Sequence, residues 1–263
     1  MSVTLHGFSW DASSSFARGA AQGPDVIRSA LFTEMSSPYS LAGVDARKAI
    51  TRYDFEALPE EPAKAREAIT DRIKNTLNAG LRPLSLGGDH SVTYPILKAM
   101  KDQHGPVNIL HIDAHPDLYP ELDGDPFSHA CPFYRAVEDG CVNTLVQVGL
   151  RSVPPESRIY GEKHGIVMLS ADELEAIPFE RLTAPLYVSI DLDGIDPAFA
   201  PGVSHPEPGG LTSREVIGLI DKLEAPLIGA DVVELNPARD INMMTAYLAA
   251  RLVKELAAKL NSD

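Results

Sequence analysis

The sequence predicts an α/β fold, a three-layer α/β/α sandwich with a mainly parallel sheet, and a single domain over residues 1–263. Two observations support this prediction. Short, near-continuous apolar runs alternate with helix-like segments, which is typical of parallel strands buried on both faces. Asp and His residues also gather at the ends of several of these runs, at the sheet edge where open α/β proteins bind ligands.

Five of the apolar runs are expected to be strands: 82–87, 107–113, 144–150, 185–191 and 226–234. Each is short and flanked by turn-forming residues, as buried strands are. The chain has no internal repeat and no Gly/Ser linker between these runs, so nothing divides it into two units.

Helices are expected between the strands and after the last one. Segment 63–79 spaces Ala, Ile and Leu at helical intervals before a glycine, and 92–103 has a similar pattern. The apolar segment 243–260 predicts a closing helix, which can bury its apolar side against its own core or against a partner. Segment 33–62 carries three prolines and an acidic turn and is expected to be a surface loop.

The composition excludes several classes of function. A net charge of −14 repels nucleic acid and anionic membranes, so we expect neither as a partner. No run approaches the roughly 18 apolar residues of a membrane span, and the N-terminus does not resemble a signal peptide. The two cysteines, Cys131 and Cys141, are expected to be buried reduced thiols. We therefore expect a cytoplasmic protein that acts on a small molecule, and some carboxylates can serve to bind metal and attract a cation.

The segment HIDAHPD at 111–117 is the most informative part of the chain. Side chains alternate along a strand, so His111, Asp113 and His115 begin on one side, and Asp117 returns to it after a proline bend. Two carboxylates and two imidazoles directly after an apolar run are costly to bury without a compensating charge. This segment alone predicts a metal site.

Two further segments complete the predicted site. His90 follows a tight glycine turn, although a single His is more often structural. Asp191 and Asp193 project to one side from the end of a strand, whereas Asp196 precedes a proline and is explained at least as well as a turn-former. Two imidazoles and four carboxylates without cysteine favour hard or borderline divalent ions, particularly Mn²⁺. Six ligands suit two ions roughly 3.5–4 Å apart, which activate water at neutral pH.

The segments GGDHS, HIDAHPDLY and SIDLDGIDPAFAPGVSHPEPGGLT resemble the three metal motifs of the ureohydrolases, the arginase–agmatinase superfamily. Residues 23–28 and the segment GADVVELNP at 229–237 resemble two further elements of that family, so the similarity covers nearly the whole chain. The resemblance implies an arginase-like fold with eight strands and a hydrolase that releases urea from a guanidino group. It also implies two Mn²⁺ per subunit and a homo-oligomer, a trimer or a hexamer.

The resemblance assigns roles at matching positions. One Mn²⁺ would be held by His90, Asp113, Asp117 and Asp191, and the other by Asp113, His115, Asp191 and Asp193, with Asp113 and Asp191 bridging. His129 matches a proton-shuttling histidine and Glu234 a carboxylate that pairs with the guanidinium, and Asp117 is counted with them as catalytic. The chemistry agrees, because a departing amine needs a proton and a planar guanidinium suits a bidentate carboxylate. Without the resemblance, His129 would be interpreted as a surface residue and Glu234 as a strand-end carboxylate.

The expected substrate is a small cationic guanidino compound. Tyr119 and Pro154 stand where animal-type arginases carry the Asn and Asp that recognise the amino-acid end of arginine, which weakens an arginase assignment. Segments 149–152 and 200–205 look closest to plant-type arginases, whereas 206–210 is more agmatinase-like. We favour arginase narrowly, with agmatinase or another guanidino-acid ureohydrolase as the alternative.

Two more residues are candidates for substrate binding. Arg151 could face a substrate carboxylate, although a structural ion pair explains it somewhat better. His205 could line the pocket, but like His6, His104 and His164 it has no metal-ligand spacing.

Two other classes of protein compete with this assignment. A deacetylase-like amide hydrolase would use one zinc and fewer carboxylates, and four aspartate ligands argue against it. A non-catalytic homologue would be expected to lack some ligands, whereas all of them are present together with His129 and Glu234.

Overall fold

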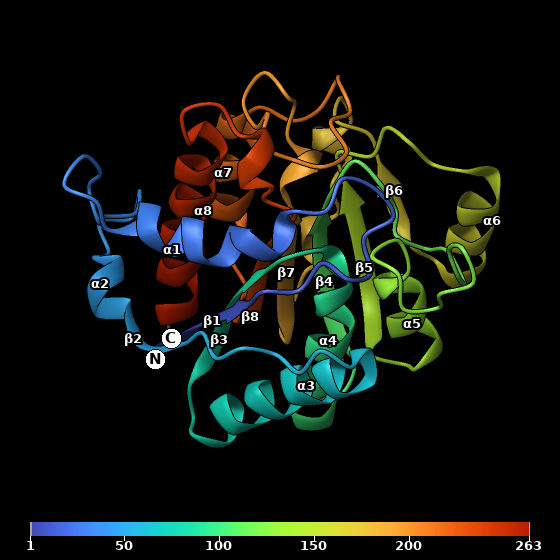
Figure 1. Ribbon diagram of the computed structural model, residues 1–263. Coiled ribbons are helices and arrows are strands. Elements are labelled where there is room, and N and C mark those ends of the chain that lie inside the picture. Colours follow the sequence, from blue (N-terminus) through green and yellow to red (C-terminus); the bar gives the residue numbers. More distant parts are fainter. Residues whose placement is uncertain (1, 263) are drawn as a thin grey trace.

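The central feature of the computed structural model, which describes residues 2–262, is an eight-stranded sheet with helices on both faces (Figure 1). The strand order is β2-β1-β3-β8-β7-β4-β5-β6, and every neighbouring pair is parallel. The predicted three-layer architecture is therefore confirmed, with a sheet that is parallel throughout.

The strands are β1 (Val3–Phe8), β2 (Ile50–Asp54), β3 (Arg82–Gly87), β4 (Val107–Ile112), β5 (Val142–Val148), β6 (Val167–Leu169), β7 (Leu186–Asp191) and β8 (Leu227–Val233). All five predicted strands are present. The expectation of a loop over 33–62 is wrong in part, because β2 and the short helix α2 (Ala46–Ala49) lie within it. β2 is an edge strand whose residues Thr51, Arg52 and Tyr53 are exposed, so it lacks the apolar pattern that marks the central strands.

Seven further helices cover the sheet: α1 (Gly23–Leu31), α3 (Pro62–Asn78), α4 (Thr93–His104), α5 (Pro132–Glu138), α6 (Pro155–His164), α7 (Ser213–Lys222) and α8 (Met244–Asn261). Helices α1, α7 and α8 pack in one apolar core, and α3, α4 and α5 in the other, so the sheet is sandwiched (Figure 1). The closing helix α8 buries its apolar side against the chain's own core, chiefly α1 and β8.

The strand order places the predicted site. β3, β8, β7 and β4 are consecutive neighbours in the sheet, although they are far apart in the sequence. Because the strands are parallel, their carboxyl ends meet at one edge, and the Asp and His clusters follow three of these ends. The fold therefore brings the three sequence motifs together.

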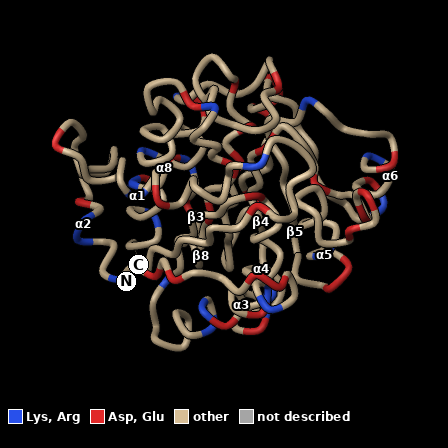
Figure 2. The backbone as a smooth tube through the Cα atoms, in the orientation of Figure 1, with Lys and Arg blue, Asp and Glu red and all other residues tan. Residues whose placement is uncertain are grey.

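The cysteines agree with the expectation from the sequence, and acidic residues are widely distributed. Asp and Glu positions occur in many segments of the chain, interspersed with Lys and Arg positions (Figure 2). Cys131 and Cys141 are buried and unpaired. Within the described residues, 2–262, none of the helices has the length and apolar character needed to cross a membrane.

Candidate metal centre and active site

His90 presents one ring nitrogen to the site, and a buried hydrogen-bond chain decides which one. Its Nε2 lies 3.0 Å from Ser189 Oγ, and the Ser189 hydroxyl lies 2.6 Å from Asp231 Oδ1. Since the carboxylate of Asp231 accepts that hydroxyl hydrogen, Ser189 Oγ must accept a hydrogen from His90 Nε2. The lone pair of a neutral His90 therefore resides on Nδ1.

Three carboxylates surround this nitrogen. His90 Nδ1 is fully buried and makes no hydrogen bond, yet it lies 3.2 Å from Asp113 Oδ2, 3.0 Å from Asp117 Oδ2 and 3.2 Å from Asp191 Oδ2. Burial acts to lower the pKa of His90, but the three carboxylates outweigh it and raise the pKa well above its ordinary value. A positive charge is therefore favoured between these four side chains, and a divalent cation would suit the same position. His90, Asp113, Asp117 and Asp191 are called the first donor group below.

His115, Asp113 and Asp193 form a second group of potential metal ligands, the second donor group. His115 Nδ1 is 3.2 Å from Asp193 Oδ2 and 3.5 Å from Asp113 Oδ1. Burial opposes a charge on His115, but Asp193 and Asp113 raise its pKa to about 12. The two groups hold no cysteine and are rich in carboxylate oxygen, which suits Mn²⁺ or a similar divalent ion.

Asp113 belongs to both groups, with one oxygen in each. Its Oδ2 faces His90 and its Oδ1 faces His115, as expected of a bridging carboxylate. Asp191 is placed differently: its Oδ2 faces His90, while its Oδ1 accepts the Asp193 backbone N–H at 2.8 Å. Burial and the neighbouring carboxylates of Asp193 and Asp113 raise the pKa of Asp191 well above its usual range. The distances thus support the bridging assignment more directly for Asp113 than for Asp191.

The local backbone is shaped for these contacts. Gly194 follows Asp193 in a short 3₁₀ turn, and a Cβ there would lie 2.7 Å from the Asp113 amide nitrogen, so only glycine allows the two segments to approach. Asp117 and Glu234 adopt φ of +50° and +67°. Left-handed conformations in non-glycine residues are strained and concentrate at functional sites.

His129 and Glu234 form a pair beside the donor groups. His129 Nδ1 lies 3.5 Å from Glu234 Oε1, and its Nε2 lies 2.9 Å from Ser15 Oγ. Burial opposes a charge on His129, but Glu234 raises its pKa to about 9. The same Glu234 oxygen accepts the His90 backbone N–H at 3.0 Å, which ties the pair to the first donor group. A histidine held in this state is suited to donate a proton.

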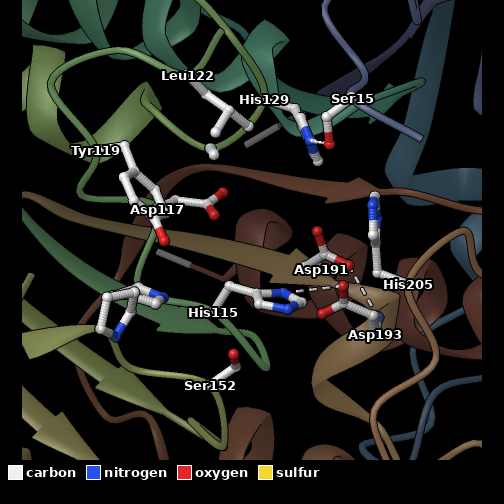
Figure 3. Close-up of a pocket in the computed structure, with 13 residues that line it drawn as sticks. Ser15, His115, Asp117, Tyr119, Leu122, His129, Ser152, Asp191, Asp193 and His205 are labelled. Carbon is white, nitrogen blue, oxygen red and sulfur yellow. Dashed lines mark hydrogen bonds and ion pairs between the residues drawn. The ribbon is translucent and has the colours of Figure 1, made fainter.

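A cavity of about 180 Å³ opens over these residues. Figure 3 shows His115, Asp117, Asp191 and Asp193 around a common space, with His129 and Ser15 above it in the view. His205 also lines the cavity, as expected from the sequence, and stacks on His129 with ring centroids 5.2 Å apart. The further lining residues are Pro116, Tyr119, Leu122, Ala130, Ser152 and Pro154. His90, Asp113 and Glu234 are buried and do not line the cavity.

Arg151 is not placed as a substrate-binding residue would be. It does not line the cavity, and its guanidinium donates to the backbone carbonyls of Gly149, Gly194, Asp193 and Glu207 at 2.5–3.0 Å. These bonds join the end of β5 to the turn that carries Asp193. The geometry supports a structural role, made with carbonyl groups rather than the ion pair that the sequence suggested.

Arg151→Ala is therefore expected to destabilise the fold by roughly 2–4 kcal/mol, because four buried or half-buried carbonyls lose a charged donor. Thermal unfolding of the metal-free protein measures this loss. If Arg151 instead contacts substrate, the variant will unfold like the wild type and show a raised KM for arginine alone.

Several residues of the site escaped the sequence analysis. Ser15 comes from the N-terminal loop, and Ser189 and Asp231 lie on β7 and β8, directly opposite each other in the strand register. Ser15 lies in none of the quoted segments, and Ser189 and Asp231 lie in segments 189–212 and 229–237 without a role that the sequence assigns. The contact between Ser189 and Asp231 follows only from the pairing of β7 and β8.

Comparisons with known proteins identify relatives of this chain. A model of the arginase family matches residues 1–258. The mitochondrial arginase 1 of Arabidopsis thaliana is 40% identical over 99% of this chain and 81% of its own length. The N(1)-aminopropylagmatine ureohydrolase of Thermus thermophilus is 36% identical over 87% of this chain and 80% of its own length. The structure of an arginase from Medicago truncatula superposes with a TM-score of 0.92 at 37% identity, covering 98% of this chain and 87% of that one.

Proposed function

This chain belongs to the arginase family, and from that premise we propose that it hydrolyses L-arginine to ornithine and urea with two Mn²⁺ ions per chain. One observation carries the proposal: two donor groups, centred on His90 and His115, share the carboxylate of Asp113. A shared carboxylate with imidazole and aspartate on either side is the donor set that a pair of divalent cations requires.

The protein's own residues supply binding and proton transfer. When bound, two such cations supply an activated water and positive charge for the developing tetrahedral centre. His129 lines the cavity and holds a proton that it can give to the departing amine. Glu234 keeps that proton on His129, and its carboxylate is the acidic group available to a guanidinium that reaches past His129.

The far end of the substrate would meet polar but uncharged groups. Apart from the donor groups and His129, the polar residues among the described residues that line the cavity are Ser15, Tyr119, Ser152 and His205, and none is Lys or Arg. Hydroxyl groups can hydrogen-bond the carboxylate of arginine, and burial lowers the pKa of His205, so it tends to be neutral. The similarity to plant arginases favours arginine, whereas the similarity to an N(1)-aminopropylagmatine ureohydrolase keeps agmatine-type substrates as the second candidate.

Urea release measured in parallel on L-arginine and agmatine tests the choice of substrate. The proposal expects turnover of arginine at a higher kcat/KM. Turnover of agmatine alone would replace arginase by agmatinase and make Tyr119 and Pro154 the decisive departures. A metal content near one zinc per chain, with amide hydrolysis instead of urea release, would favour a deacetylase-like enzyme.

Removal of divalent metal is expected to lower the thermal stability of the protein. Binding to the folded state alone stabilises by about 2.7 kcal/mol at 100 times Kd. For a chain of this size that corresponds to roughly 5–10 °C in Tm. Scanning calorimetry after chelation, then with added Mn²⁺ or Mg²⁺, measures the shift, which should be larger for Mn²⁺. An identical Tm in all three states would argue against a built metal centre.

We also propose that the chain assembles as a trimer or hexamer in the cytoplasm. Large apolar side chains are exposed on the segment before α2 and beside the start of α8, among them Met35, Leu41, Ile241 and Met244. Where such side chains are contiguous on a surface, they favour protein contacts. Native mass measurement tests the assembly, and a monomer at micromolar concentration would contradict it.

A further inference from the structure

Asp113, the carboxylate shared by both donor groups, is hydrogen-bonded by a side chain that is not among the assigned metal ligands. His111 lies two residues earlier on β4, is completely buried, and places its Nε2 2.8 Å from Asp113 Oδ2. Gln147 on β5 stands directly opposite His111 in the strand register and is also completely buried. Its Nε2 lies 2.9 Å from His111 Nδ1 and 2.7 Å from the carbonyl oxygen of Pro116.

The Pro116 carbonyl determines the direction of the hydrogen bonds that link Gln147, His111 and Asp113. A carbonyl oxygen can only accept, so it must face the amide NH₂ of Gln147 rather than its oxygen. The second hydrogen of that NH₂ points to His111 Nδ1, which must then be the unprotonated nitrogen. A neutral His111 therefore carries its proton on Nε2 and donates it to Asp113 Oδ2.

The other oxygen of Asp113 has its own donor. Asp113 Oδ1 accepts the backbone N–H of His115 at 2.6 Å. Each carboxylate oxygen thus receives one hydrogen bond from the protein and keeps lone-pair capacity toward its own donor group. This is the arrangement that a carboxylate needs to serve two cations at once.

His111 lies near enough to His90 and Asp113 to be considered a ligand itself. Both of its nitrogens are already used, however, because Nδ1 accepts from Gln147 and Nε2 donates to Asp113. Its ring also packs on Phe133, with centroids 3.9 Å apart, and Phe133 is fully buried. The ring is therefore fixed in place by packing as well as by hydrogen bonds.

We propose that Gln147 and His111 are a positioning pair that holds Asp113 in the orientation in which each of its oxygens faces one cation. The inference rests on the proposed two-metal function. Loss of a side chain that hydrogen-bonds a metal ligand and orients it typically lowers metal affinity by about 10–100-fold. The pair would act on metal binding first and on turnover only through it.

The test is the Mn²⁺ dissociation constant of the metal-free, full-length protein, titrated against a competing chelator. His111→Phe keeps a flat ring but removes the donor, and should raise Kd by about 10–100-fold. His111→Gln can place an amide donor near the former Nε2, and should bind Mn²⁺ close to the wild-type level. Gln147→Met removes the donor to His111 and should raise Kd by about 10-fold.

His6→Phe is the matched control. His6 is also a buried histidine on a sheet strand, but its Nε2 pairs with Thr76 Oγ1, away from both donor groups. This variant should lower Tm and leave the Mn²⁺ dissociation constant unchanged. It separates a general loss of core packing from a specific effect on Asp113.

Each outcome either supports or overturns the proposed positioning pair. A raised Kd for His111→Phe with near-normal binding by His111→Gln supports the positioning pair. Loss of one equivalent of Mn²⁺ in both His111 variants would show that His111 is a ligand and would overturn the positioning role. An unchanged Kd in His111→Phe would also overturn that role. If His111→Phe does not fold, an unchanged Kd in Gln147→Met overturns it instead. A wild-type protein that binds no Mn²⁺ would refute the proposed function itself.

Discussion

Replacing Asp113 by Ala is expected to lower urea formation by at least about 10³-fold and to reduce bound Mn²⁺. Asp113 gives one oxygen to the His90 group and the other to the His115 group, so its loss damages both. Metal ions contribute several kcal/mol of charge stabilisation in hydrolysis, and about 1.4 kcal/mol corresponds to a factor of ten in rate. Metal content by elemental analysis and urea release measured on the same sample give both quantities.

Asp113→Asn sharpens this experiment, because Asn keeps the shape but replaces one charged oxygen by an NH₂ group. Asp196→Asn is the matched control: Asp196 lies in the same motif as Asp191, but it accepts backbone N–H groups of residues 198, 209 and 210 instead of facing the donor groups. The control should keep its metals and most of its rate. Full metal retention in Asp113→Asn would refute the bridging role.

The second large effect is expected for His129→Ala, which should keep both metals but lose about 10²–10⁴-fold in kcat, the range typical of a general acid–base group. His129 contacts Glu234 and Ser15 but is not placed to hold a cation. Its removal should therefore leave unchanged the Mn²⁺ dissociation constant and the rise in Tm on Mn²⁺ binding. Proton transfer to the departing amine should fail.

The neighbours of His129 provide the comparison. Glu234→Gln removes the negative charge that keeps His129 protonated, so the pKa of His129 in the metal-free protein should fall from about 9 toward or below its ordinary value. Imidazole chemical shifts followed against pH by NMR measure this directly. An unchanged rate in His129→Ala would remove His129 from the mechanism, whatever its pKa.

The fold could be predicted where burial leaves a clear pattern. The five predicted strands are largely buried, whereas β6 has three residues, β2 is an exposed edge, and β1 carries His6 and Gly7 within its short run. Helix α7 did carry a usable feature that the sequence analysis passed over. Thr212 and Glu215 form a reciprocal capping box at its start.

The donor residues could be predicted because they are concentrated in short motifs at strand ends. His129 and Glu234 needed the family resemblance, since their pairing joins segments that no local pattern connects. The geometry supports the structural role that the sequence favoured for Arg151, but its partners could not be predicted, because Asp193, Gly194 and Glu207 are 42–56 positions away. Gln147 and His111 are 36 positions apart and meet only through the register of β4 and β5.

A two-cation centre that produces urea is the core of the proposed function. The most direct test is urea release from L-arginine by metal-stripped protein, followed as Mn²⁺ is added and plotted against Mn²⁺ bound per chain. We expect negligible urea without metal and a maximum at two Mn²⁺ per chain. A maximum at one Mn²⁺, or urea release that persists in the stripped protein, would contradict it.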